Sequence, residues 1–219
     1  MKIIELKETI TASNDRDAEV LRDRLKRSKT LLINLMSSPG AGKTTLLERT
    51  IKDVKDGLKI GVIEADVDSD VDAVRLAELG ITAVQAHTDG MCHMDAGMTE
   101  TALTELGFED HDLIFLENVG NLICPAEFDT GSGRNVMILS VPEGDDKPLK
   151  YPLMFTKSHV LLITKIDTMQ VFDFDIGKCV SRARKLNPDI RVFPVSAKTG
   201  EGMDAWEEWL LDEIRAWQE

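Results

Sequence analysis

The chain has 219 residues, a formal net charge of −13 and 42% hydrophobic residues, a composition typical of one substantial α/β domain. The acidic balance argues against nucleic-acid binding, and no apolar run approaches the ~20 residues that a membrane-spanning helix needs. The charged first residues lack the apolar core of a signal peptide, and three cysteines argue against a disulfide framework. We therefore expect a cytoplasmic protein with neither a nucleic-acid nor a membrane partner.

Apolar runs rich in β-branched residues alternate with amphipathic stretches along the chain. The predicted strands are residues 31–36, 60–63, 81–84, 113–116, 136–139, 160–163 and 190–193. The predicted helices are residues 42–55, 69–79, 94–106, 174–186 and 203–217. An earlier helix is expected to start at Ser13-Asn14-Asp15, because Ala18, Leu21 and Leu25 then follow at helical spacing. The pattern predicts a mostly parallel seven-stranded sheet flanked by helices, in one domain with residues 1–29 as an N-terminal helical extension and 30–219 as the core.

A phosphate-binding loop lies between the first predicted strand and the helix that follows it. Residues 37–44 match the template G-x-x-x-x-G-K-S/T, except that Ser37 takes the first glycine position. Lys43 is expected to reach the β- and γ-phosphates of a nucleotide, and the Thr44 hydroxyl to bind Mg²⁺. The fold class is therefore a P-loop NTPase. The residues of the predicted loop are Pro39, Gly40, Ala41, Gly42, Lys43, Thr44 and Thr45.

A second phosphate-side group follows the strand at 113–116. Gly120 is expected to contact a γ-phosphate through its N–H, and Glu117 to reach Mg²⁺ directly or through water. Asp66 supplies a second magnesium-side carboxylate at the end of another strand. Asn121 stands where many GTPases carry a water-orienting glutamine, and Arg134 is the candidate for an arginine finger, so intrinsic hydrolysis should be slow. The predicted catalytic residues are Lys43, Thr44, Asp66 and Glu117.

Two further motifs indicate that the nucleotide is GTP. Thr164-Lys165-Ile166-Asp167 matches N/T-K-x-D, and a carboxylate at Asp167 can accept hydrogen bonds from guanine N1–H and its 2-amino group. Ser196-Ala197-Lys198 is expected to contact guanine O6 through its backbone. Each motif follows a predicted strand, where ligands of parallel sheets bind. A P-loop ATPase or small-molecule kinase is the rival class, and Asp167 argues against it.

Cys92, His93 and Cys124 are candidate metal ligands. The first two lie in a turn that opens a predicted helix, and Cys124 lies four residues after Gly120. Two thiolates and an imidazole suit Zn²⁺ and also Ni²⁺. The spacing alone leaves a metal site and ordinary packing equally open. Cys179, inside a predicted helix, has no neighbouring ligand and is expected to pack in the core.

Three stretches together resemble the HypB family of GTPases, which help to insert nickel into nickel–iron hydrogenases. They are residues 37–45, the segment Glu117-x-x-Gly120-Asn121-Leu122-x-Cys124-Pro125, and Cys92-His93. Residues 144–152 are similar as well, and the likeness extends from about Asn14 to the end of the chain. The resemblance implies that Cys92, His93 and Cys124 bind the metal of the GTPase domain, at the interface of a homodimer.

The resemblance also implies ligands and partners. The ligands are GTP or GDP, Mg²⁺, and Ni²⁺ or Zn²⁺; the partners are a nickel-delivery maturation protein and the hydrogenase large subunit. Some members carry an additional N-terminal nickel motif rich in cysteine or histidine. The first 90 residues here contain no cysteine, so we expect no separate nickel site in them. Lys147 and Lys150, in the 144–152 segment, are hypothesised to approach the partner subunit's nucleotide.

The spacing of Gly120 and Cys124 on one loop suggests how the two sites communicate. If GTP draws Gly120 toward the γ-phosphate, Cys124 must move or be held with it, and nucleotide state then biases metal affinity. We expect a regulatory GTPase that loads or releases Ni²⁺ during hydrogenase maturation. The alternatives are a urease-type nickel GTPase and a zinc-stabilised GTPase scaffold whose metal is purely structural.

Overall fold

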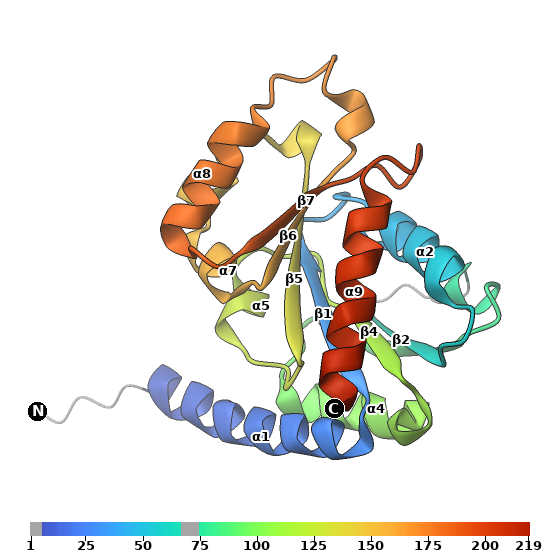
Figure 1. The fold of residues 1–219 in the computed structure, drawn as a ribbon. Helices are drawn as coiled ribbons and strands as arrows, with labels where there is room; N and C mark the ends of the chain where they lie inside the picture. The colour runs from blue at the N-terminus through green and yellow to red at the C-terminus, as the bar shows by residue number, and fades with distance from the viewer. Residues whose placement is uncertain (1–5, 67–74) are drawn as a thin grey trace, which may run out of the picture.

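The computed structural model of the chain describes residues 6–66 and 75–219 (Figure 1). Its sheet contains seven strands in the order β3-β2-β4-β1-β5-β6-β7, and every neighbouring pair is parallel. The predicted fold class is confirmed. The strands are β1 Leu31–Ser37, β2 Ile60–Asp66, β3 Thr82–His87, β4 Leu113–Glu117, β5 Arg134–Ser140, β6 Val160–Thr164 and β7 Arg191–Pro194.

Helices cover both faces of this sheet. Helices α2 and α9 pack together on one face, whereas α1, α4, α5, α7 and α8 lie on the other (Figure 1). Short 3₁₀ turns occur at Phe108–Asp110, Val141–Glu143 and Ile166–Thr168. The helices are α1 Leu6–Ser28, α2 Lys43–Val54, α4 Ala96–Leu106, α5 Cys124–Glu127, α6 Lys147–Lys150, α7 Pro152–Lys157, α8 Ile176–Leu186 and α9 Met203–Gln218.

The central strand β1 shows why the strands read as continuous apolar runs. All seven of its residues are buried, because helices cover both of its faces. Leu31 and Ile33 pack with α2 and α9, whereas Leu32, between them, packs with α1 and α4. Side chains alternate between the two faces of a strand, so a strand covered on both sides has no polar face to alternate with.

Helix α1 corrects the predicted start of the N-terminal helix. The helix is already formed at Leu6, seven residues before Ser13. Asn14 does not cap it, because the Asn14 side chain is buried and bonds the Asp129 carbonyl and the Ala96 N–H. The prediction of a helix start at Ser13-Asn14-Asp15 was therefore wrong, because Asn14 makes tertiary contacts and does not cap a helix. The spacing argument for the buried face was right, since Ala18, Leu21 and Leu25 are buried.

Other boundaries differ by one to three residues from those predicted, and the largest differences are at the ends of β2 and β3. Helix α4 begins after the N-cap Asp95, whose side chain accepts a hydrogen bond from the Met98 N–H, and α8 begins in the same way after Asp175. The short helices α5, α6 and α7 were not predicted. The predicted helix at 69–79 lies partly in residues 67–74, outside the described residues. Among the described helices, none combines the length and apolarity needed to cross a membrane.

Candidate functional site

A cleft of about 880 Å³ opens at the carboxyl edge of the parallel sheet. It lies where β1, β2, β4 and β6 end, which is the usual ligand edge of such sheets. Nearly all residues predicted from the nucleotide motifs line it. They are Pro39, Gly40, Ala41, Gly42, Lys43, Thr44, Thr45, Asp66, Glu117, Gly120, Lys165, Asp167, Ala197 and Lys198.

The loop between β1 and α2 has the backbone shape that an anion site requires. Gly40 and Gly42 have φ angles of 74° and 94°, in the left-handed region that favours glycine. The Lys43 ammonium donates a hydrogen bond of 3.0 Å to the Ser37 hydroxyl. Ser37, at the position of the missing first glycine, thus holds the lysine beside the loop.

Oxygen ligands suited to Mg²⁺ meet next to this loop. The Thr44 hydroxyl donates to Glu117 Oε1 at 2.8 Å, and both side chains are buried. Asp66, at the end of β2, lines the same cleft. One hydroxyl and two carboxylates fit a hard cation that takes its remaining ligands from phosphate and water. Thr44, Glu117 and Asp66 would hold the ion, and bound Mg²⁺ would supply charge neutralisation at the phosphates.

The side of the cleft that carries the N/T-K-x-D motif is tied to the phosphate loop. Lys165 has a left-handed φ of 60° and donates from Nζ to the Gly40 carbonyl at 2.8 Å. The preceding Thr164 hydroxyl donates to the Ala41 carbonyl at 2.9 Å. These bonds hold β6 and the phosphate loop together across 123 and 125 residues of sequence.

Ser196 acts on Asp167 instead of lining the cleft. It is fully buried, and its hydroxyl donates to Asp167 Oδ1 at 2.7 Å. The same hydroxyl accepts from the Thr199 N–H at 3.2 Å, within the turn before α9. Ala197 and Lys198 line the cleft beside it. The carboxylate is therefore already oriented, with its other oxygen available for a base.

The loop from Glu117 to Cys124 passes directly over the phosphate loop. A Cβ on Gly120 would stand 3.1 Å from Pro39 atoms, so the close approach favours glycine there. The next side chain, Asn121, turns away from the cleft: its Nδ2 donates to the Cys92 carbonyl at 3.4 Å and its Oδ1 accepts from the Ile123 N–H at 2.8 Å. The residue at the usual glutamine position thus contacts the cysteine–histidine loop.

Arg134 is excluded as an arginine finger acting within its own chain. It stands at the start of β5, at the end of the sheet opposite the cleft. Its guanidinium pairs with Glu213 of α9 at 2.7 Å. A cation that the sequence analysis missed is Arg75, which lines the cleft and pairs with Glu48 at 3.0 Å. No motif marks Arg75, so only its position in the fold identifies it.

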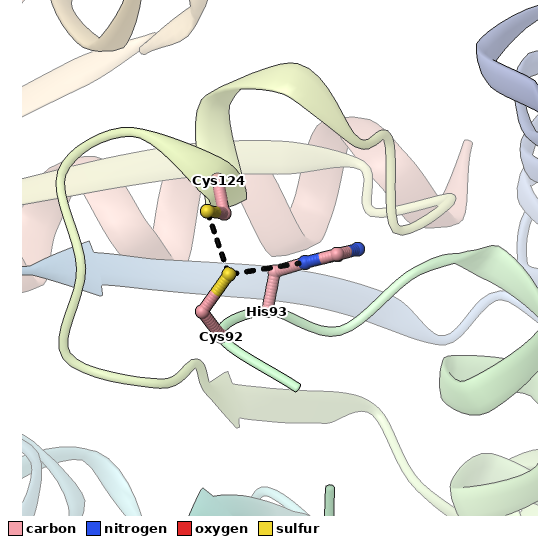
Figure 2. Close-up of side chains that lie close together, drawn as sticks. All are labelled: Cys92, His93 and Cys124. Carbon is pink, nitrogen blue, oxygen red and sulfur yellow. Dashed lines mark hydrogen bonds between the residues drawn. The ribbon is translucent and has the colours of Figure 1, made fainter. Parts of the chain in front are cut away.

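Cys92, His93 and Cys124 converge beside this loop, as Figure 2 shows. Their ligand atoms all lie within 4.8 Å of one another, in the only such group that the described residues contain. The Cys92 and Cys124 sulfurs are 2.6 Å apart, and His93 Nδ1 is 3.8 Å from the Cys92 sulfur. Sulfurs on one tetrahedral ion stand about 3.8 Å apart, so binding requires them to separate by roughly 1 Å. The donor set fits Zn²⁺ or Ni²⁺.

Burial affects the protonation of His93, Cys124 and Cys179. Burial lowers the pKa of His93, whose ring stacks on Phe128 at 3.9 Å between centroids. The hydrogen bond with Cys92, together with burial, raises the pKa of Cys124. Cys179 is fully buried, and burial raises its pKa to about 12. Cys179 packs among apolar side chains between α8 and the sheet, as expected.

Lys147 and Lys150 both have partners within the chain. Lys150 Nζ lies 2.6 Å from Asp146, and this ion pair lowers the pKa of the exposed carboxyl. Lys147 Nζ lies 3.8 Å from Glu143 and 5.4 Å from the Tyr151 ring centroid. Lys150 is the more accessible, with 59% of its side chain exposed against 19% for Lys147.

Comparison with known proteins gives consistent matches. Residues 31–194 match the family described as CobW/HypB/UreG, nucleotide-binding domain. The hydrogenase maturation factor HypB of Escherichia coli (strain K12) is 44% identical over 209 residues, covering 95% of this chain and 72% of that protein. The hydrogenase/urease maturation factor HypB of Helicobacter pylori (strain J99) is 38% identical, covering 98% and 89%. The crystal structure of HypB from Helicobacter pylori in complex with nickel has a TM-score of 0.87 at 39% identity, covering 93% of this chain and 96% of that one.

The parallel sheet, the phosphate loop and the cleft define a P-loop nucleotide-binding protein. The matched relatives add more than the fold, because the likeness extends across the cysteine–histidine cluster and nearly the whole chain. The chain belongs to the HypB family of hydrogenase maturation factors.

Proposed function

We propose that the protein binds and hydrolyses GTP and uses this cycle to assist nickel insertion into a nickel–iron hydrogenase. One observation carries the proposal: a single loop joins Gly120, over the phosphate loop, to Cys124, 2.6 Å from Cys92. The nickel complex of the Helicobacter pylori relative supports nickel as the metal handled here. Zn²⁺ fits the same donors, and free thiols suit the reducing cytoplasm.

The guanine side supports GTP over ATP. The Asp167 carboxylate, held by Ser196, accepts the two donors that guanine presents and adenine lacks. Lys43 and the magnesium-side oxygens of Thr44 and Glu117 neutralise and orient the phosphates. Asn121 is engaged with the Cys92 carbonyl, so it does not orient an attacking water, and hydrolysis by the isolated chain is slow.

Coupling follows from the shared loop. A γ-phosphate that binds the Gly120 N–H displaces the loop, and the displacement reaches Cys124 through three intervening residues. Metal affinity then depends on nucleotide state, and by linkage nucleotide affinity depends equally on metal. A structural zinc would lack this dependence. The name of the Helicobacter pylori relative includes urease, so a urease is the alternative client enzyme.

A homodimer is supported by apolar side chains beside the metal cluster. Ile123, Leu149 and Leu153 are 56%, 66% and 42% exposed, and they lie on α5, α6 and α7 or next to them. Helix α7 packs against both α5 and α6. Lys150 stands on the same set of helices, so it is the better candidate for reaching the partner subunit's nucleotide. A nickel-delivery protein and the hydrogenase large subunit are the proposed further partners.

The test is metal binding to the wild-type chain in two nucleotide states. We expect the nickel dissociation constants with GDP and with a non-hydrolysable GTP analogue to differ by about fivefold or more. The same protein should hydrolyse GTP slowly and discriminate against ATP in competition. Equal nickel affinities in both states would leave a metal site but refute the switch, and equal affinity for ATP would refute the guanine assignment.

A further inference from the structure

Asn118 is a buried side chain between the two sites, and only 1% of it is exposed. It directly follows β4 and precedes the Val119-Gly120 turn. Its backbone N–H donates to the Leu35 carbonyl at 3.0 Å, which fixes its main chain to β1. Its side chain is therefore the part that can respond to a change in either neighbouring loop.

One atom of this side chain accepts hydrogen bonds from both loops. Asn118 Oδ1 accepts from the Val119 N–H at 2.9 Å and from the Met94 N–H at 3.2 Å. Val119 belongs to the loop from Glu117 to Cys124, whose Gly120 is proposed to bind the γ-phosphate. Met94 directly follows the candidate ligand His93. A carboxamide oxygen has two lone pairs, so these two donors complete its capacity.

The other end of the carboxamide fixes its orientation. Asn118 Nδ2 donates to Asn34 Oδ1 at 3.0 Å, and Asn34 Nδ2 donates to Asn135 Oδ1 at 3.0 Å. The three amides thus form one directed chain across β4, β1 and β5. If the Asn118 carboxamide rotated by half a turn, its NH₂ group would face the Met94 and Val119 N–H donors. Its oxygen would then face the Asn34 Oδ1 acceptor. Burying these unpaired groups would cost free energy, so the observed orientation is fixed.

We propose that Asn118 is the positioning residue that transmits nucleotide state to the segment that carries Cys92 and His93. The inference rests on the proposed function, because it names the element through which the GTP-dependent change in metal affinity passes. When Gly120 moves toward a γ-phosphate, the Val119 N–H moves with it. The single oxygen that it shares with the Met94 N–H must then re-aim, and the bond to Met94, already the longer one, lengthens or breaks.

A second buried asparagine offers a matched control on the opposite side of the metal loop. Asn14 is 9% exposed, and its Oδ1 accepts from the Ala96 N–H at 2.9 Å, two residues beyond Met94. Its Nδ2 donates to the Asp129 carbonyl at 2.9 Å. Asn14 therefore supports the same segment as Asn118, but it belongs to α1, and neither of its two side-chain bonds reaches the loop from Glu117 to Cys124.

The first experiment measures nickel dissociation constants of the full chain, saturated with GDP or with the GTP analogue. The readout is the ratio of the two constants, because a purely structural role would weaken both equally. We expect Asn118→Ala to reduce a wild-type ratio of about fivefold or more to within about twofold of one. Asn14→Ala, which removes a bond to the same segment from the other asparagine, should keep the wild-type ratio.

The outcomes separate the two claims. A wild-type ratio of one refutes the coupling in the proposed function, and with it the inference. A wild-type ratio of about fivefold that Asn118→Ala preserves refutes the inference alone. Loss of the ratio in Asn14→Ala as well would also refute it, because any support of the loop would then suffice.

A second measurement uses only the wild-type chain and so does not depend on whether a variant folds. Hydrogen exchange at the Met94 and Val119 amides is compared in the two nucleotide states. We expect the protection of Met94 to change together with that of Val119, by about threefold or more, while the Ala96 amide held by Asn14 does not change. Unchanged protection at Met94 would overturn the proposal.

Discussion

The two ends of the nucleotide cleft are built differently. At the guanine end, Thr164 and Lys165 hold the phosphate loop, and Ser196 orients Asp167. These bonds join segments that the sheet already fixes. At the phosphate end, the loop that begins at Glu117 is held by side chains which a ligand would displace: Thr44 donates to the Glu117 carboxylate, and Asn118 shares one oxygen between two loops.

The difference separates recognition from switching. Under the proposed function, a preorganised guanine end would spend little free energy on ordering, and GTP and GDP would bind through the same contacts there. A phosphate end whose own hydrogen bonds must be exchanged for bonds to Mg²⁺ and γ-phosphate responds to the one group that distinguishes GTP from GDP. Cys124 lies on that same loop, so in the proposed function the cysteine–histidine cluster responds to the phosphate end and not to the guanine end.

The largest effect is expected from Lys43→Ala at the phosphate end. Loss of the ammonium removes the charged hydrogen bonds to the β- and γ-phosphates, at a cost of about 3 kcal/mol or more. Triphosphate binding should fall by at least about a hundredfold in calorimetry. The fold should persist, because Lys43 bonds only the Ser37 hydroxyl among the contacts described. Normal GTP binding by a folded variant would remove the phosphate-loop assignment.

Cysteine variants test the cluster that the switching end carries. Cys92→Ala and Cys124→Ala should each remove stoichiometric nickel or zinc binding, because two remaining ligands hold these ions weakly. Cys179→Ala is the matched control: it should keep the metal and lose about 1–2 kcal/mol of unfolding free energy through a small cavity. Metal analysis after gel filtration, with urea unfolding of each variant, distinguishes them. Full metal content in both cluster variants would contradict the site.

Asp167→Asn tests the rigid end. The asparagine amide repels the 2-amino group of guanine and can donate to the 2-oxo group of xanthine. GTP binding should weaken by roughly 2–4 kcal/mol, while XTP binding should improve. Ser196→Ala serves as the control, since it frees the Asp167 carboxylate without changing its chemistry and should weaken GTP by about 1 kcal/mol with no gain for XTP. Unaltered GTP affinity in Asp167→Asn would exclude this residue from base recognition.

The sheet and the cleft were predictable because their signals are local. Every predicted strand is present, since burial on both faces leaves an apolar run that sequence shows directly. The phosphate loop and the N/T-K-x-D motif can also be recognised from their residue types and from their position after a strand. The cysteine–histidine cluster was left open by spacing and depended on resemblance, because Cys92 and Cys124 meet only when the loops after β3 and β4 are brought together.

What sequence reasoning missed depends on contacts between distant segments. Nothing in the local sequence shows that Asn14 would bond residues 96 and 129, or that Asn118, Asn34 and Asn135 would form a directed chain. Arg134 appeared to be a candidate finger until its strand placed it at the far end of the sheet. Asparagine is common in turns and caps, so its use as a tertiary connector leaves no pattern to read.

The smallest predicted effect concerns the support beneath the guanine end. Arg49 of α2 lies under the loop before α9, where a Cβ on Gly200 would stand 3.1 Å from its guanidinium. Arg49 pairs with Asp53, and Asp53 in turn faces Glu207 of α9. Burial, together with the hydrogen bond to Asp53, raises the pKa of Glu207 from 4.5 to about 7, and Asp204 adds to the shift while Arg49 opposes it.

The sign of the pH dependence follows from this shift. A carboxyl whose pKa is higher in the folded state contributes stability that is fully present below its unfolded pKa and is lost as pH rises through about 7. The Glu207 side chain is only partly buried, so solvent screens part of this effect. In urea unfolding, we expect the wild type to lose about 1 kcal/mol of stability between about pH 5 and pH 8, and Glu207→Gln to abolish that loss. GTP affinity of Glu207→Gln should stay within about twofold of wild type. Thr164, Lys165 and the Asp167 carboxylate hold the guanine end without any contact with Glu207. A larger loss of affinity would show that the guanine end depends on the α2–α9 contact as well.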